Sequence, residues 1–319
     1  MESIHELTAK YIDYCQYQKS LNLNTLKAYK IDLAQFESFF TGYNAALSKA
    51  LISEYVVTLH KNYKPKSAKR KIASLKAFFS YLEYEELIAV NPFAKMKVRF
   101  QEPTTLPRTI SSFNLQRFFN ALYACAEDQP YTSKQQHTTI RDIAIFELLF
   151  GTGMRISELC NLRLNDLDLQ GGNVRIFGKG SKERVVQLTN TEIIIALERH
   201  FRINGSWSSP AGHLFANRLN ERLSEQSVRN LIRKYCSLAS ISEHITPHMF
   251  RHTFASLLLE ENVDIRYIQS ILGHSSITTT QIYTHVSSGR QREILVASHP
   301  RNKITLSGFN PDIPEKLLD

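Results

Sequence analysis

The sequence is poor in cysteine and has no long apolar run. Its 319 residues include four cysteines, at positions 15, 125, 160 and 236, and no two lie close together. Such spacing indicates neither a Cys-x-x-Cys metal site nor a dense disulfide framework, so we expect reduced thiols in a cytoplasmic protein. The longest apolar stretch, 143–150, is interrupted by Glu147 and is too short to span a bilayer. The start of the chain, with Glu2 and Glu6, also lacks the apolar run of a secretory signal.

The sequence also has fewer acidic residues than basic ones. It has 30 of the former against 39 lysines and arginines, which gives a formal net charge of +9 and a pI near 9.3. This balance favours a polyanionic partner, although on charge alone a merely basic soluble protein is an equal alternative. The hydrophobic content of 43% is that of an ordinary globular protein, and the length suits two domains.

Residues 1–99 have the periodicity of helices. We expect Asn24 to cap a helix through Phe40 whose apolar residues are spaced roughly as i, i+3 and i+7. Ser48 and Ser67 are predicted to begin two further helices, and the pair at 91–92, Asn-Pro, ends the region. The first domain is therefore predicted to be a helical bundle over residues 1–100.

The strongest basic run of the chain surrounds the third of these helices. No acidic residue interrupts it, and its members at the helix start lie where backbone N–H groups favour a phosphate. A solvated helix face is the ordinary alternative for such a run. The residues that we expect to contact a polyanion are Lys64, Lys66, Lys69, Arg70 and Lys71.

A segment without a clear period separates this domain from a second one. It carries Pro103 and Pro107 and is predicted to be an extended linker over 101–110. The second domain, 111–290, is predicted to be helical apart from a β-hairpin, a polar loop lies around 127–139, and a partly irregular tail follows over 291–319. The hairpin strands are expected at 173–177 and 184–188, and the helices at 112–126, 141–150, 156–162, 191–201, 224–239, 246–261, 265–272 and 278–286. The fold class is thus mainly α with a small β-hairpin or sheet, in two domains.

His248 and Arg251 lie three residues apart on a predicted helix, so they share one face of it. Pro247 suits the first helical turn with Thr246 as its cap, which places His248 at the positive end of the helix. Taken alone, the pair is also consistent with an ordinary surface pair. His252 follows at a metal-ligand spacing, but no cysteine or acidic residue nearby completes a zinc shell, so we predict no metal.

Three further segments carry candidate residues. Arg155 follows a Gly-x-Gly turn, and Glu158, one helical turn later, can orient its guanidinium. Lys179 is predicted at the tip of the hairpin. The ordinary alternative for this Gly-Lys-Gly sequence is an exposed turn without a function. His274 follows a glycine that is predicted to form a left-handed helix cap, and Tyr283 comes nine residues later. A histidine that interacts with a helix dipole and a core tyrosine are the ordinary alternatives for these two.

Together these residues suggest one chemistry. Two arginines can grip a phosphate, two histidines can handle protons, and a phenol can attack phosphorus, which would break and remake a DNA strand without water or metal. No Walker-type loop indicates a nucleotide cofactor.

The contexts of these residues resemble, in order and spacing, those of the tyrosine recombinase (phage integrase) family, and its Xer-type members in particular. They are Gly-Thr-Gly-Met-Arg-Ile-Ser-Glu-Leu, Gly-Lys-Gly-Ser-Lys-Glu-Arg, Pro-His-Met-Phe-Arg-His-Thr-Phe and Leu-Gly-His-Ser-Ser-Ile-Thr-Thr-Thr-Gln-Ile-Tyr. The resemblance covers about residues 1–286, and four motifs in order are far more specific than one. It implies a SAM-like core-binding domain and an α+β catalytic domain whose site residues are Arg155, Lys179, His248, Arg251, His274 and Tyr283.

The resemblance also implies a role for each residue. Tyr283 would attack a DNA phosphodiester to form a 3′-phosphotyrosyl link and release a 5′-hydroxyl. His248 is the candidate base and Lys179 the candidate proton donor to the departing oxygen. The two arginines would bind the non-bridging oxygens, and His274 would donate a hydrogen bond to the same phosphate.

The implied partner is double-stranded DNA with a specific recombination site. Four protomers, alike or from two related recombinases, would exchange strands through a Holliday junction without a cofactor, in the cytoplasm. The role could be mobile-element integration and excision or Xer-type dimer resolution. A type IB topoisomerase-like relaxation of DNA and a DNA-binding accessory protein without catalysis are the alternative functions.

Overall fold

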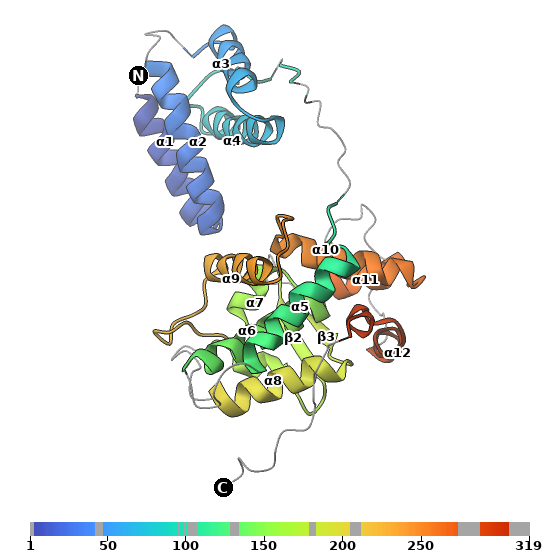
Figure 1. Cartoon of the computed structure of the whole chain (residues 1–319). Coiled ribbons are helices and arrows are strands. Elements are labelled where there is room, and N and C mark those ends of the chain that lie inside the picture. The colour runs from blue at the N-terminus through green and yellow to red at the C-terminus, as the bar shows by residue number, and fades with distance from the viewer. Residues whose placement is uncertain are drawn as a thin grey trace. The chain divides into compact units, whose positions relative to one another are not determined.

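The chain divides into two compact units, Met1–Thr105 and Leu106–Asp319. The computed structural model describes residues 3–41, 47–94, 96–98, 100, 107–127, 134–178, 183–204, 212–273 and 288–305 (Figure 1). Helices dominate both units, and a small sheet lies in the second. The predicted fold class, mainly α with a small sheet in two domains, is confirmed.

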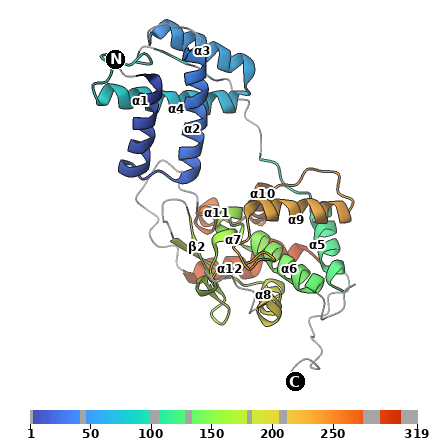
Figure 2. The same cartoon turned by 90° about the vertical axis from the view of Figure 1, so that its left-hand side faces the viewer.

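The first unit is a bundle around an aromatic core. Its elements are α1 (Ile4–Asp13), a π-helical turn (Tyr14–Gln18), α2 (Leu23–Thr41), α3 (Lys49–Asn62) and α4 (Pro65–Tyr84). Helices α1 and α2 lie side by side, and α4 packs across both (Figure 2). The ring of Phe36 contacts those of Tyr55 and Phe79 edge to face, at centroid distances of 5.2 and 5.7 Å.

Two of the three helix starts predicted for this unit are displaced. Ser48 caps α3 as expected, because its hydroxyl accepts a hydrogen bond from the N–H of Leu51. The cap of α2 is Asn22 rather than Asn24, since the Asn22 side chain accepts from the N–H of Thr25 at 2.9 Å. Helix α4 begins at Pro65, two residues before Ser67, because proline is preorganised for the first helical position.

The second unit combines helices with a three-stranded antiparallel sheet in the order β1-β2-β3. Its helices are α5 (Ser112–Glu127), α6 (Lys134–Thr152), α7 (Ile156–Asn161), α8 (Thr191–Asn204), α9 (Glu225–Leu238), α10 (Pro247–Glu260), α11 (Ile265–Leu272) and α12 (Ser288–Ser298), with 3-10 turns at Leu164–Asp166 and Pro300–Lys303. The strands are β1 (Leu167–Asp168), β2 (Asn173–Phe177) and β3 (Glu183–Gln187). The hairpin β2–β3 is the one that the sequence predicts, shifted by one residue in its second strand.

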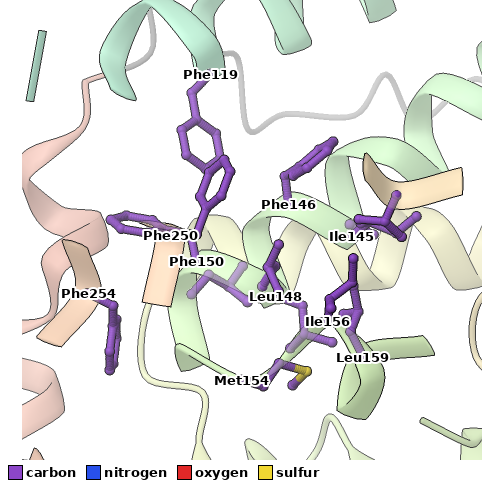
Figure 3. Close-up of a cluster of buried hydrophobic side chains, with 14 of the residues drawn as sticks. Phe119, Ile145, Phe146, Leu148, Phe150, Met154, Ile156, Leu159, Phe250 and Phe254 are labelled. Carbon is purple, nitrogen blue, oxygen red and sulfur yellow. The ribbon is translucent and has the colours of Figure 1, made fainter. Parts of the chain in front are cut away.

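Helix α6 is the core of the second unit. Residues 139–152 are all buried, and the helix packs against α5, α8 and α10. Figure 3 shows side chains of α5, α6, α7 and α10 converging there, and the ring of Phe146 lies 4.9 Å from that of Phe118 and 5.9 Å from that of Phe250. Helix α6 begins at Lys134, inside the polar loop predicted around 127–139. Its first turns bury two polar side chains, those of Gln136 and Thr139, so a polar sequence here does not mean an exposed loop.

The end of the described chain also belongs to this core, although the sequence analysis assigns it to a tail. Leu295 and Ile304 are buried in the same apolar cluster. The fully buried guanidinium of Arg301 donates from Nε and Nη2 to the carboxylate of Glu147 on α6, at 2.7 and 2.9 Å. His299 Nε2 lies 2.8 Å from the carbonyl oxygen of Gly151. The core of the second unit therefore includes side chains as far along the described chain as Ile304.

Candidate active site

Arg155 is placed by a glycine turn at the end of α6. Gly153 has φ +58, and a Cβ atom there would come within 2.7 Å of the side chains of Leu272 and Phe254. Only glycine allows both the left-handed backbone and this close approach. The turn brings Arg155 to the N-cap position of α7 with about a third of its side chain exposed (34%), so the guanidinium can reach a ligand from solvent.

Glu158 fixes the direction of Arg155, as the sequence predicts. Its carboxylate accepts the backbone N–H of Arg155 at Oε2 and the guanidinium Nη1 at Oε1, both at 2.8 Å. Burial alone would raise the pKa of Glu158, but hydrogen bonds from Arg184 and Arg155 outweigh it and lower the pKa below its ordinary value. The carboxylate is therefore ionised at neutral pH.

Arg184, on β3, is a site residue that the sequence analysis does not identify. Its guanidinium forms a fork on Glu158, with Nη1 3.2 Å from Oε1 and Nη2 2.7 Å from Oε2. The remaining nitrogen of the guanidinium, Nε, donates to the carbonyl oxygen of Ile271 at 2.9 Å. Only 10% of the side chain is exposed. The signal in the sequence is an arginine in a short strand, which alone predicts an exposed position.

Arg251 lies on α10 and is buried, with 5% of the residue exposed. Its Nη1 donates to the carbonyl oxygen of Gly153 at 2.8 Å and its Nη2 to that of Leu272 at 2.7 Å. Burial lowers its pKa to about 10, with a further contribution from the positive charge of Arg155. The guanidinium stays charged at neutral pH, and two of its five N–H donors are used by these carbonyls.

His248 is exposed in the first turn of α10, one turn before Arg251. Thr246 occupies the N-cap position and Pro247 the first helical position, as predicted, but the Thr246 side chain forms no capping hydrogen bond. The neighbouring His252 is partly buried, and burial together with the charges of His248 and Arg251 lowers its pKa. Among the described residues, no group of three or more His, Cys, Asp or Glu side chains could hold a metal ion.

Lys179, His274 and Tyr283 lie outside the described residues, but the segments that lead to them are described. Strands β2 and β3 pair up to Phe177 and Glu183, and the segment that contains Lys179 connects these two residues in the sequence. Helix α11 ends at Gly273, whose φ of +65 confirms the predicted left-handed cap immediately before His274. The last two carbonyl oxygens of this helix, those of Ile271 and Leu272, accept hydrogen bonds from Arg184 and Arg251.

The basic run of the first unit divides into two parts. Lys64, Lys66 and Lys69 are exposed at the start of α4. Arg70, about half exposed, donates to the buried carboxylate of Asp32. Lys71 shares the buried face of α4.

The surroundings of Lys71 correct its assignment to DNA contact. Its Nζ lies 3.0 Å from Asp32 Oδ1, donates to Gln35 and stands 4.8 Å from the centre of the Tyr63 ring. Only 5% of its side chain is exposed, because Lys71 lies one turn from both Ala68 and Leu75, which face the core. Lys71 therefore stabilises the bundle and does not present its ammonium to a ligand.

Comparison with known proteins identifies the family. The phage integrase family matches residues 118–290, and the phage integrase N-terminal SAM-like domain matches residues 9–86. A tyrosine recombinase of Agathobacter rectalis is 46% identical over 302 residues, covering 94% of this chain and 98% of the relative. A tyrosine recombinase XerC of Thermodesulfovibrio yellowstonii is 36% identical over 302 residues, covering 92% and 96%. The chain belongs to the phage integrase family and is a tyrosine recombinase.

Two solved structures share its fold. One is the XerH site-specific recombinase bound to palindromic difH substrate, with a TM-score of 0.68 and 22% identity, covering 90% of this chain and 83% of that one. The other is a lambda integrase tetramer bound to a Holliday junction, with a TM-score of 0.66 and 17% identity, covering 90% and 81%. Among the described residues, no helix is long and apolar enough to cross a membrane.

Proposed function

We propose that this protein is a site-specific DNA recombinase of the Xer type, which cleaves and rejoins strands through a 3′-phosphotyrosyl bond at Tyr283. The observation that carries the proposal is the arginine cluster at the end of α11. Arg155 and Arg184 form ion pairs with the carboxylate of Glu158, and Arg251 lies within electrostatic range of all three, so the cluster has two positive charges in excess.

This excess matches the charge that develops at phosphorus. A phosphodiester carries one negative charge, and the pentacoordinate species formed by attack of an anionic nucleophile carries two. Fixed guanidinium groups in a partly buried site stabilise that charge without reorganising, which is the main way in which enzymes favour such transition states. Arg155 would bind one non-bridging oxygen through its exposed edge, and Arg251 would use its remaining donors for the other.

Proton transfers complete the reaction. A phenol with a pKa near 10 is only ~0.1% ionised at neutral pH, which corresponds to about 4 kcal/mol, so Tyr283 needs a base. His248 is suited to this role, because it is exposed one helical turn from Arg251. Lys179, which lies between β2 and β3 in the sequence, would protonate the departing 5′-oxygen, and His274 would donate a hydrogen bond to the phosphate.

The first unit supplies a surface for duplex DNA. The exposed lysines Lys64, Lys66 and Lys69 stand at the N-terminus of α4, where the positive end of a 20-residue helix adds to their attraction for phosphate. Arg70 is held by Asp32 with half of its side chain exposed, so it can add a further contact. Binding dominated by such contacts should weaken steeply with salt. The active assembly is proposed to be a tetramer on two DNA sites.

A nicked suicide substrate tests the proposal, because it traps the covalent intermediate by losing the strand needed for rejoining. The wild-type protein should form an adduct with DNA that contains its recombination site, and Tyr283→Phe should bind the same DNA without forming one. Adduct formation by Tyr283→Phe would reject the proposed nucleophile. Relaxation of plasmids that lack any specific site would favour the topoisomerase-like alternative instead.

A further inference from the structure

We propose that Arg184 is a positioning residue for strand cleavage: it keeps Arg155 available to the scissile phosphate and fixes the end of α11 before His274. This inference rests on the function proposed above. It concerns an arginine of strand β3 that lies outside the set of six candidate site residues, and three independent features of its surroundings support it.

The first feature is the competition for Arg155. Glu158 is almost completely buried and holds Arg155 through two hydrogen bonds. Without another partner, this carboxylate would cancel the charge of Arg155 and compete with a phosphate for it. The fork of Arg184 engages both oxygens of the same carboxylate, so the group of three retains one net positive charge. Arg155 is thereby oriented by Glu158 without being neutralised by it.

The second feature is the end of α11. The last carbonyls of a helix lack partners within the helix. Here Nε of Arg184 satisfies Ile271 and Nη2 of Arg251 satisfies Leu272. A Cβ atom on Gly273 would come within 3.0 Å of Arg184 Cδ and 3.1 Å of its Nη1, so glycine at this position also leaves room for the guanidinium. The residue that follows this capped turn is His274.

The third feature is the place of Arg184 in the hairpin. It pairs with Ile176 of β2 and follows Glu183, which is four residues after Lys179 in the sequence. One guanidinium therefore ties together three segments that are distant in sequence: the hairpin, the start of α7 and the end of α11. A displacement of any of them would move a candidate site residue relative to the phosphate.

The test compares Arg184→Gln and Arg184→Lys with a matched control, Arg175→Gln, on the neighbouring strand β2. Arg175 is half exposed and stands 3.8 Å from Glu183, so its substitution removes an arginine from the same hairpin without touching Glu158. Each variant is assayed for DNA affinity and for the single-turnover rate of adduct formation on the suicide substrate. We expect Arg184→Gln to slow cleavage about 100-fold at saturating protein, the order of loss caused by small misplacements of reacting groups. The DNA affinity of Arg184→Gln should stay close to that of the wild type. Arg175→Gln should keep both the wild-type affinity and the wild-type cleavage rate.

A neutral substrate separates positioning from general damage to the fold. Replacing one non-bridging oxygen of the scissile phosphate by a methyl group removes the negative charge that Arg155 must meet, while the same P–O5′ bond breaks and the same Tyr283–P bond forms. The defect of Arg184→Gln should shrink at least about tenfold on this methylphosphonate, as expected when a charge-assisted contact no longer matters. Arg184→Lys keeps the charge but loses the fork, so it should cleave at an intermediate rate on the phosphodiester.

The outcomes distinguish this inference from the proposed function. If wild-type protein forms no adduct, the proposed function fails. If wild-type protein cleaves and both Arg184 variants cleave equally well, only the role of Arg184 is overturned. An equal defect of Arg184→Gln on the charged and the neutral substrate would also overturn it, because damage to the fold does not depend on the charge of the phosphate. If Arg184→Gln does not fold, Arg184→Lys gives the same comparison.

Discussion

Removal of the Arg301 guanidinium should destabilise the second unit strongly. Arg301 and Glu147 are both fully buried, and Glu147 accepts two hydrogen bonds from Arg301 and one, at 2.8 Å, from the hydroxyl of Tyr123. In Arg301→Met the carboxylate of Glu147 loses both hydrogen bonds from Arg301 and keeps the one from Tyr123. A buried negative charge then has lost its counter-ion. Breaking a buried ion pair in this way costs about 3–5 kcal/mol. The free energy of unfolding should fall by that amount.

Urea unfolding measures the loss. Helices dominate the second unit, so far-ultraviolet circular dichroism follows its unfolding. With a slope of about 1–3 kcal/mol per molar urea, the midpoint should shift by about 1–5 M. Glu147→Leu/Arg301→Met should be more stable than Arg301→Met, because the double substitution removes both charges.

Lys303→Met is the matched control for this experiment. Lys303 lies two residues further along and forms an ion pair with Glu261 at 2.8 Å, but both side chains are more than a third exposed. An exposed pair of this kind contributes at most about 1 kcal/mol. If Arg301→Met were no less stable than Lys303→Met, residues 299–305 would not be anchored on α6 and the account of this segment would be refuted.

Three other predictions follow from the described contacts. Arg155→Ala should slow adduct formation by about 10²–10³, as loss of one transition-state donor does, while a filter-binding assay shows unchanged DNA affinity. Lys66→Gln should reduce the slope of log affinity against log salt by about 1, whereas Lys71→Gln should lower the thermal stability of the first unit because it leaves Asp32 with one cation fewer. Burial lowers the pKa of His299 from 6.5 to about 4. Between these two pH values the imidazole is protonated in the unfolded chain and neutral in the folded chain. Stability should therefore fall as the pH drops through this window, by up to about 1.4 kcal/mol per pH unit, and His299→Gln should flatten the slope measured by urea unfolding at pH 4.5–7.

The sequence predicts most of the helices because burial on one face leaves a periodic pattern. It places α5, α8, α10, α11 and the β2–β3 hairpin within a few residues of their observed bounds. The starts of α2 and α4 are less predictable, since they depend on which of several neighbouring residues forms the cap or the first turn. Asn22 and Asn24 are equivalent in the sequence, and only the hydrogen bond to Thr25 distinguishes them.

Contacts between distant segments account for what the sequence analysis does not find. Arg184 looks like any polar residue of a hairpin until β3 is placed beside Glu158 and Ile271. Arg301 follows a proline in a region without periodicity, and its main ionic partner, Glu147, lies 154 positions earlier in the chain. Lys71 is hidden within a basic run, although its spacing from Ala68 and Leu75 marks the buried face of α4.

Mass spectrometry of the covalent intermediate identifies the residue that attacks the DNA. After incubation with the suicide substrate, nuclease digestion should leave a short 3′-phosphorylated oligonucleotide attached to the peptide that contains Tyr283, at the tyrosine oxygen. This adduct should be absent in Tyr283→Phe and much less abundant in Arg155→Ala. Nucleotide attached to another residue, or none on a substrate that the protein binds and nicks, would show that Tyr283 is not the nucleophile.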